Sequence, residues 1–157
     1  MDVPEIINRM RAKGLSLATA ESCTGGRISA AITAISGASD VFQGAVVAYQ
    51  SRVKTELLGV PEEVITKYDV VSEQVASRMV RGACKCLSAD IAIASTGYAG
   101  PSSANPNIPV GTIWIACGTE NEVLTKRLSL QGDRVQNVEK AVEEALGLLE
   151  EFINHTI

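Results

Sequence analysis

A hydroxyl-rich turn near the amino terminus, Thr19-Ala-Glu-Ser-Cys-Thr-Gly-Gly26, is the first stretch with the residue types for catalysis. It follows a short apolar run, and its two glycines allow a helix to begin close to a bound group. Such a turn places Ser22 or Thr24 beside free backbone N–H groups, which stabilise anions and oxyanions. The same residues also suit an ordinary capped helix with glycines for tight packing. The turn alone favours neither interpretation.

A second candidate group follows the next apolar run, which ends at Tyr49. Ligands of open α/β sheets bind beyond the carboxyl ends of strands, and Tyr49 lies at such an end. Lys54 lies one turn into the following helix and is close enough to lean back over it. The alternative is that Tyr49 caps the core and Lys54 is solvated, the usual environment of lysine. Taken in isolation, this segment favours that alternative.

The base that activates a nucleophile here is expected to be a lysine. The only histidine, His155, is the third residue from the end of the sequence, where chains commonly fray. A Ser-His or Cys-His pair needs a rigidly held imidazole, so we set such pairs aside. Burial lowers the pKa of a lysine enough for it to act as a base.

Two further stretches are weaker candidates. Ser95-Thr-Gly-Tyr-Ala-Gly-Pro101 leads into a long polar loop, but it matches neither a P-loop nor a dinucleotide fingerprint. In Gly132-Asp-Arg134, the aspartate is expected to cap the last helix. Arg134 either contacts a phosphate or lies in water.

Strands alternate with helices, which predicts an α/β fold: a three-layer α/β/α sandwich with a mostly parallel, mixed sheet, in a single domain over residues 1–157. The last two strands are expected to form an antiparallel hairpin. The expected strands are Leu15–Ala20, Val41–Tyr49, Ile91–Ser95, Gly111–Cys117 and Val123–Leu130. The expected helices are Pro4–Lys13, Arg27–Ile35, Arg52–Leu58, one opened by Pro61, one capped by Ser72 and running to Leu87, and Arg134 to about Phe152.

Composition excludes several classes of protein. The formal net charge is −4 with scattered Lys and Arg, which argues against a nucleic-acid groove. No apolar run approaches the ~20 residues of a membrane span, and the start lacks the features of a signal peptide, so we expect a cytoplasmic protein without membrane attachment. Its four cysteines form no Cys-x-x-Cys pair, and we expect them reduced, with no metal site and no cofactor.

Together, the candidate stretches resemble the CinA C-terminal domain family. The matching motifs cover most of the chain, from about residue 4 to residue 153. They are Ala20-Glu-Ser-Cys-Thr-Gly-Gly26, Gly44-Ala-Val-Val-Ala-Tyr49 with Lys54, Leu58-Gly-Val-Pro61, Val71-Ser-Glu73, Thr96-Gly-x-Ala-Gly-Pro101, Pro109-Val-Gly-Thr112 and Gly132-Asp-Arg134. The resemblance implies an α/β sandwich that hydrolyses nicotinamide mononucleotide (NMN) to nicotinate mononucleotide and ammonia by a serine/lysine mechanism. We also expect a homo-oligomer.

This chain departs from the family pattern at two places. Ser51 replaces an asparagine that the family usually has two residues after the tyrosine. The loop after Pro101 is usually glycine-rich, but here Ser102–Ile108 contains no glycine, and Tyr98 replaces a common isoleucine. The positions of nucleophile and base are retained. These departures put the substrate and the rate in question.

We therefore assign Lys54 as general base, held and tuned by Tyr49, and Ser22 as the first choice of nucleophile. Ser39 is the rival, because both serines fall in family motifs. The substrate-binding positions, including oxyanion N–H groups of the glycine pair and a phosphate contact of the arginine, are Glu21, Thr24, Gly25, Gly26, Ser51, Thr96, Gly97, Gly100 and Arg134. Two alternatives stay open: a non-catalytic nucleotide-binding module and a competence-related interaction protein.

Overall fold

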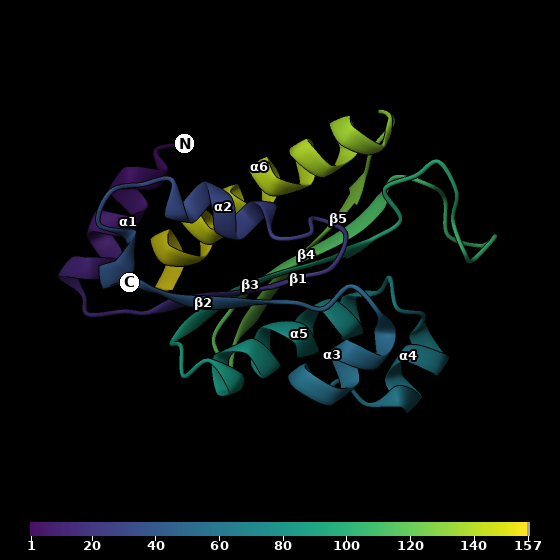
Figure 1. The fold of residues 1–157 in the computed structure, drawn as a ribbon, viewed down its shortest axis with the longest axis horizontal. Coiled ribbons are helices and arrows are strands. Elements are labelled where there is room, and N and C mark those ends of the chain that lie inside the picture. Colours follow the sequence, from purple (N-terminus) through teal and green to yellow (C-terminus); the bar gives the residue numbers. More distant parts are fainter. Residues whose placement is uncertain (157) are drawn as a thin grey trace.

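A five-stranded mixed sheet runs through the middle of the structure, a computed structural model that describes residues 1–156 (Figure 1). The strand order is β2-β1-β3-β4-β5. Strand β1 pairs in parallel with β2 and β3, whereas β4 pairs antiparallel with both β3 and β5. The strands are β1 (Leu17–Glu21), β2 (Phe42–Val47), β3 (Ile91–Gly97), β4 (Thr112–Gly118) and β5 (Val123–Ser129). The predicted mixed sheet and its final hairpin are confirmed.

Helices cover both faces of the sheet and complete the predicted three layers (Figure 1). The helices on one face are α1 (Val3–Ala12), α2 (Arg27–Thr33) and α6 (Arg134–Thr156). Those on the other are α3 (Ser51–Leu58), α4 (Glu62–Tyr68) and α5 (Glu73–Cys86). No helix within residues 1–156 is both long and apolar enough to span a bilayer.

The two faces of the sheet carry side chains of different size. Leu17 and Ile93 belong to the apolar cluster under α1, α2 and α6. Their neighbours Ala18 and Ala92 point to the opposite face, because successive strand residues alternate, and pack in the cluster with α3 and α5. Gly82 of α5 continues this close packing. A Cβ atom there would lie 2.0 Å from a backbone oxygen of α3, so α3 is held tightly against α5.

Two helix caps expected from the sequence are present. The Ser72 hydroxyl accepts a hydrogen bond from the Val75 amide at 3.2 Å. Asp133 accepts from the Gln136 amide at 2.9 Å, and the Gln136 side chain accepts in return from the Asp133 amide at 3.0 Å. This reciprocal pair fixes the start of α6, and with it the position of the next residue, Arg134.

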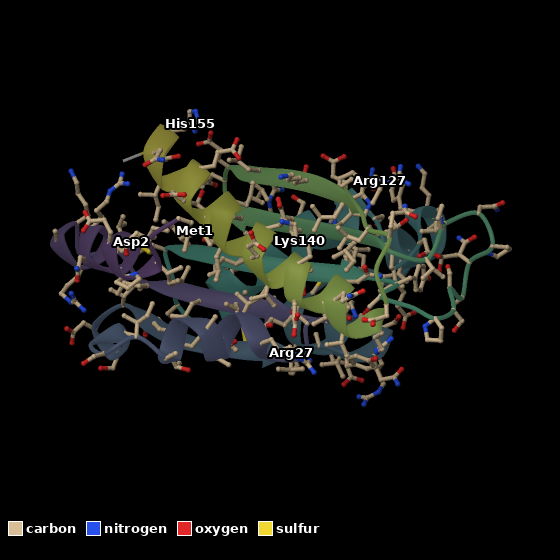
Figure 2. The ribbon with its side chains drawn as sticks, turned by 90° about the horizontal axis from the view of Figure 1, so that it is seen from above. Met1, Asp2, Arg27, Arg127, Lys140 and His155 are labelled. Carbon is tan, nitrogen blue, oxygen red and sulfur yellow. The ribbon has the colours of Figure 1, made fainter. Side chains whose placement is uncertain are left out.

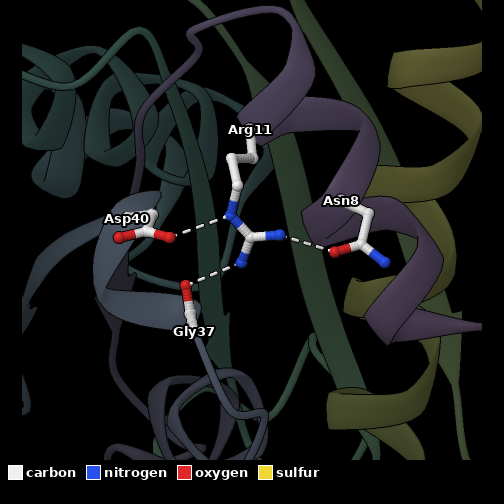
Figure 3. A network of polar contacts seen from close by, with 4 residues as sticks. All are labelled: Asn8, Arg11, Gly37 and Asp40. Carbon is white, nitrogen blue, oxygen red and sulfur yellow. Dashed lines mark hydrogen bonds and ion pairs between the residues drawn. The ribbon is translucent and has the colours of Figure 1, made fainter.

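The turn that contains Ser39 is fixed at the far end of β2 by an arginine of α1 (Figure 3). The Arg11 guanidinium donates to the Gly37 carbonyl at 2.9 Å and to the Asp40 carboxylate at 3.0 Å. It also donates to Asn8 on its own helix at 2.6 Å. These bonds tie the short 3-10 helix η1 (Ala38–Asp40) to α1, at the amino end of the strand that leads to Tyr49.

The register of the parallel strands brings three strand ends together. Glu21, the last residue of β1, pairs with Val47 of β2 and with Ser95 of β3. The residues that follow these positions therefore meet at one edge of the sheet. These are the Ser22 turn, the Ala48–Tyr49 segment and Thr96, and this edge holds the candidate site.

Candidate active site

The Lys54 side chain reaches from α3 to the serine at the end of β1. Its Nζ lies 2.8 Å from Ser22 Oγ, 2.7 Å from the Ala48 carbonyl oxygen and 3.3 Å from the Tyr49 carbonyl oxygen. Lys54 is only 1% exposed, and Ser22 is 7% exposed. The two carbonyls accept two N–H bonds of a neutral amine, which leaves the nitrogen lone pair directed at the serine hydroxyl. This arrangement suits proton removal from Ser22.

Burial gives Lys54 a lower pKa than an ordinary lysine. Loss of hydration penalises the charged ammonium and lowers its pKa from 10.5 to about 8. None of its three hydrogen-bonding partners is a carboxylate that would favour the charged form. A sizeable fraction of Lys54 is therefore a neutral amine near pH 8, the form that can accept a proton.

Tyr49 contacts Lys54 through its backbone and not through its ring, so the carbonyl is the group by which Tyr49 holds the lysine. Its carbonyl accepts from Lys54, whereas the residue as a whole is 55% exposed. The phenol oxygen accepts a hydrogen bond from the Arg134 guanidinium at 2.8 Å. The same guanidinium donates to the Gly100 carbonyl at 2.6 Å. Tyr49 and Arg134 thus link the two sides of the site entrance.

Glu21 and Thr24 build the turn, and neither lines the site cavity, contrary to their expected contact with substrate. The Glu21 carboxylate is fully buried and accepts from the amides of Ile28 and Ser29 at 2.8 and 2.9 Å. Thr24 donates its hydroxyl to the same carboxylate at 2.7 Å. This internal anion satisfies the first turn of α2 and holds the helix against the end of β1.

The glycine pair Gly25-Gly26 also has a structural role in this turn. Both Gly25 and Gly26 have a positive φ, at 57° and 98°. The Gly25 amide donates to the Ser22 carbonyl at 3.0 Å, so its N–H closes the turn and is not free for an oxyanion. This differs from the expectation that it would serve as an oxyanion donor. The turn instead presents the Ser22 side chain toward Lys54.

Ser95 was not assigned to the site from the sequence, yet its hydroxyl supports the turn that contains Ser22. It shares a 2.7 Å hydrogen bond with the Thr24 hydroxyl. Its backbone carbonyl accepts from the Ser22 amide at 3.0 Å. Burial raises the pKa of the neighbouring Cys23 to about 11, despite a hydrogen bond with Ser95 that lowers it, which leaves this cysteine a neutral thiol. The sequence did contain one signal that Ser95 belongs to the site, because this residue lies at the carboxyl end of a predicted strand.

A cavity of about 210 Å³ opens beside Ser22 and Lys54. Its walls include both family departures considered above, Ser51 and the Ser102 loop, together with several backbone segments. The lining residues are Ser22, Cys23, Tyr49, Gln50, Ser51, Lys54, Val70, Val71, Thr96, Gly97, Tyr98, Ala99, Ser102 and Arg134. Of the expected substrate-binding residues, the structure therefore brings Ser51, Thr96, Gly97 and Arg134 to one cavity. Gly100 contributes through its bond to Arg134.

The loop that borders this cavity is held by Asp69, a residue that the sequence did not single out. The Asp69 carboxylate accepts from the Tyr98 phenol at 2.8 Å and from the Asn105 amide at 3.1 Å. Thr96 is bound in the same region, because its hydroxyl donates to the Val70 carbonyl at 2.9 Å. Tyr98 and Asn105 thus fasten the loop to the α4–α5 connection.

Ser39 and His155 both lie away from the cluster. Ser39 belongs to η1, separated from Tyr49 by the length of β2, or about 20 Å for a six-residue strand. The structure therefore does not bring Ser39 to Lys54. His155 lies near the opposite end of α6 from Arg134, about 30 Å along the helix (Figure 2).

Comparisons with known proteins agree with the fold and with the motifs. Residues 3–153 match the family model described as CinA C-terminal domain. A CinA-like protein of Cytophaga hutchinsonii is 40% identical over 140 residues, which is 89% of this chain and 34% of that protein. The chain thus spans about a third of the length of the curated relatives it matches.

Solved structures cover all or nearly all of the chain. The competence damage-inducible protein A of Klebsiella pneumoniae superposes with a TM-score of 0.93 and 35% identity, over 100% of both chains. The competence/damage inducible protein CihA of Agrobacterium tumefaciens gives a TM-score of 0.87 and 35% identity, over 96% of this chain and 95% of that one.

Proposed function

The chain belongs to the CinA C-terminal domain family, and we propose that it is an amidohydrolase that deamidates NMN with Ser22 as nucleophile and Lys54 as general base. One observation carries the proposal. A buried lysine, held by two carbonyls and with a pKa of about 8, lies 2.8 Å from a serine hydroxyl at the wall of a cavity. A solvated lysine or a serine that merely caps a helix would have neither the burial nor the contact.

The reaction follows from this geometry in two halves. Neutral Lys54 accepts the Ser22 proton while Oγ attacks the amide carbon, which gives a tetrahedral oxyanion. The Lys54 ammonium returns that proton to the leaving nitrogen, so ammonia departs and an ester to Ser22 remains. A water molecule then loses a proton to Lys54 and attacks the ester. Nicotinate mononucleotide leaves, and the proton returns to Ser22.

Recognition of the amide is assigned to polar side chains of the cavity wall. Because the Gly25 amide is engaged within the turn, the oxyanion is stabilised by other donors, for which Gln50, Ser51 and Ser102 line the cavity. Ser51 offers one hydroxyl where the family usually has a carboxamide. We expect this loss of a hydrogen-bond donor to lower the rate of the reaction and not to change the type of reaction.

An ammonia-release assay tests the proposal. The purified chain is incubated with NMN, nicotinamide, nicotinamide riboside and glutamine, in buffer that contains EDTA because no metal is required. We expect ammonia and nicotinate mononucleotide from NMN, and at least ~10²-fold slower release after Lys54→Arg, since arginine does not deprotonate in the working range. An active Lys54→Arg variant contradicts the Ser/Lys mechanism. Binding of NMN without turnover supports the non-catalytic module instead.

Cytoplasmic location and assembly into a homo-oligomer stay predictions. Cell fractionation tests the first, and sedimentation velocity of the purified chain tests the second.

A further inference from the structure

The loop between β3 and β4 forms part of the active-site wall, but little packing holds it there. Figure 1 shows this loop projecting beyond the end of the sheet. Every residue from 101 to 110 is at least partly exposed. Ser102 lines the active-site cavity, whereas Asn107 and Ile108 line a separate cavity of about 320 Å³. Polar contacts, and not burial in the core, therefore fix the position of this wall.

These polar contacts meet at the carboxylate of Asp69, in the α4–α5 connection. The Tyr98 phenol, which lines the active-site cavity, donates to one carboxylate oxygen at 2.8 Å. The Asn105 side-chain amide donates to the other oxygen at 3.1 Å. The side-chain oxygen of Asn105 in turn accepts from the Asn107 backbone amide at 2.9 Å. One carboxylate thus holds both the start of the loop and its middle.

The backbone of Asp69 adopts a conformation that glycine enters freely and other residues do not. Its φ is 76° and its ψ is 156°. Strain of this kind persists only where surrounding contacts offset it, and it is concentrated at functional sites. At Asp69 the carboxylate supplies such contacts, because it accepts from Tyr98, from Asn105 and from the Val71 amide at 2.9 Å.

The contact with Tyr98 keeps its donor over the working pH range. Burial, together with the hydrogen bond to Asp69 and the charge of that carboxylate, raises the pKa of Tyr98 to about 12. A hydrogen bond to a charged group shifts an equilibrium by about tenfold or more. The loop is therefore ordered before a ligand arrives, whereas a mobile loop would spend part of the binding energy on its own ordering.

We propose that Asp69 is a positioning residue for the reaction, which acts through Tyr98 and Asn105 to hold residues 98–108 as a preformed wall for the substrate. This inference rests on the proposed function for the identity of the substrate. The two departures of this loop from the family pattern, Tyr98 and the glycine-free segment, then belong to one set of contacts. The carboxylate sets the shape of the cavity without reaching the reacting atoms.

An Asp69→Gly variant tests the proposal, because glycine removes the carboxylate and accepts the same backbone angles. Ser88→Gly is the matched control. Ser88 also has a positive φ, of 51°, but precedes β3 at the end of the strand opposite to Tyr98. Hydrogen exchange of peptides that cover residues 98–109 reports on the loop without any ligand. We expect exchange there to become at least ~10-fold faster in Asp69→Gly and to stay unchanged in Ser88→Gly.

NMN binding and turnover then separate positioning from a purely structural role. We expect Asp69→Gly to raise KM at least ~5-fold and to leave kcat within about twofold, because the loop must be ordered at each binding event. Calorimetric titration of NMN into Ser22→Ala, with and without Asp69→Gly, should show the same loss of affinity without turnover. Tyr98→Phe keeps the ring and removes the phenol oxygen, so Asp69→Gly should have a smaller effect in that background than in the parent.

Each result decides the proposal. Loop exchange that is unchanged in Asp69→Gly, or equally faster in Ser88→Gly, overturns the role of the carboxylate. Faster exchange with unchanged NMN affinity and KM overturns positioning, as does a fall in kcat alone. Tight NMN binding by the Ser22→Ala variant that weakens with Asp69→Gly, in a chain whose parent releases no ammonia, overturns the deamidase alone. If NMN does not bind, both proposals fail.

Discussion

Replacement of Lys54 by methionine has two opposing effects on stability. It removes the cost of a buried charge beside Ser22, and it removes the hydrogen bonds that the amine donates. Methionine keeps the aliphatic length but carries no charge and no base. The difference between a pKa of 10.5 and about 8 corresponds to about 3 kcal/mol of cost for holding the charged form in the folded protein. Against this, the variant leaves the carbonyls of Ala48 and Tyr49 without the amine donor that they have in the parent protein.

The pH dependence isolates the charge from the lost hydrogen bonds. Below pH 8 the lysine is protonated in both the folded and unfolded states, so the full cost is present. Between pH 8 and 10.5 the unfolded chain binds more protons than the folded one, so the stability of the parent protein rises with pH. Relative to Lys54→Met, the parent protein is therefore expected to gain about 2–3 kcal/mol between pH 7 and pH 10.

Urea unfolding followed by circular dichroism at both pH values measures this difference. Lys13→Met serves as the control, because Lys13 is exposed at the end of α1 and its replacement should show no such change with pH. In parallel, turnover of the parent protein should rise with pH and level off above about 8, and Lys54→Met should lose at least ~10²-fold. An equal stability difference at pH 7 and pH 10 refutes the argument that burial lowers the pKa of Lys54.

Three other features give independent predictions. In a thiol titration of the native protein, the exposed Cys86 should react rapidly, whereas the buried Cys23, with a pKa of about 11, should react only on unfolding; fast labelling of both contradicts the packing of the turn. Gly82→Ala should destabilise the protein by about 1–3 kcal/mol in urea unfolding, because its Cβ would overlap the Leu58 carbonyl; an unchanged midpoint shows that α3 is less tightly held. Glu21→Gln should reduce kcat more than it raises KM, since an amide has one acceptor oxygen in place of the two that accept from the Ile28 and Ser29 amides; a change in KM alone would mean that this residue contacts substrate.

The fold was predictable because its elements have strong local signals. Ser72 and Asp133 carry the caps expected of them, and the alternation of strands with helices predicted the three layers. The ends of the strands were harder to predict where pairing with a neighbouring strand decides them. Strand β3 extends past the predicted Ser95 to Gly97, because Thr96 and Gly97 pair with β4, a long-range contact that no local pattern contains.

The site was predictable in its residue types and less so in their roles. The positions of Ser22 and Lys54 followed from the motifs, but their 2.8 Å contact depends on how α3 packs on α5. Glu21 was expected to bind substrate because it lies in the motif, whereas its carboxylate satisfies the backbone of α2. Tyr49 contacts Lys54 through its backbone carbonyl, whereas a sequence pattern gives information on the side chain only.

Of the two candidate serines, Ser22 and Ser39, the structure brings only Ser22 to Lys54. The most direct measurement is mass spectrometry of the protein quenched during turnover of NMN, for the parent chain and for Ser22→Ala and Ser39→Ala. We expect an acyl-enzyme in the parent and in Ser39→Ala, and neither adduct nor ammonia in Ser22→Ala. An adduct that persists in Ser22→Ala, or one that disappears only in Ser39→Ala, contradicts the assignment of Ser22 as nucleophile.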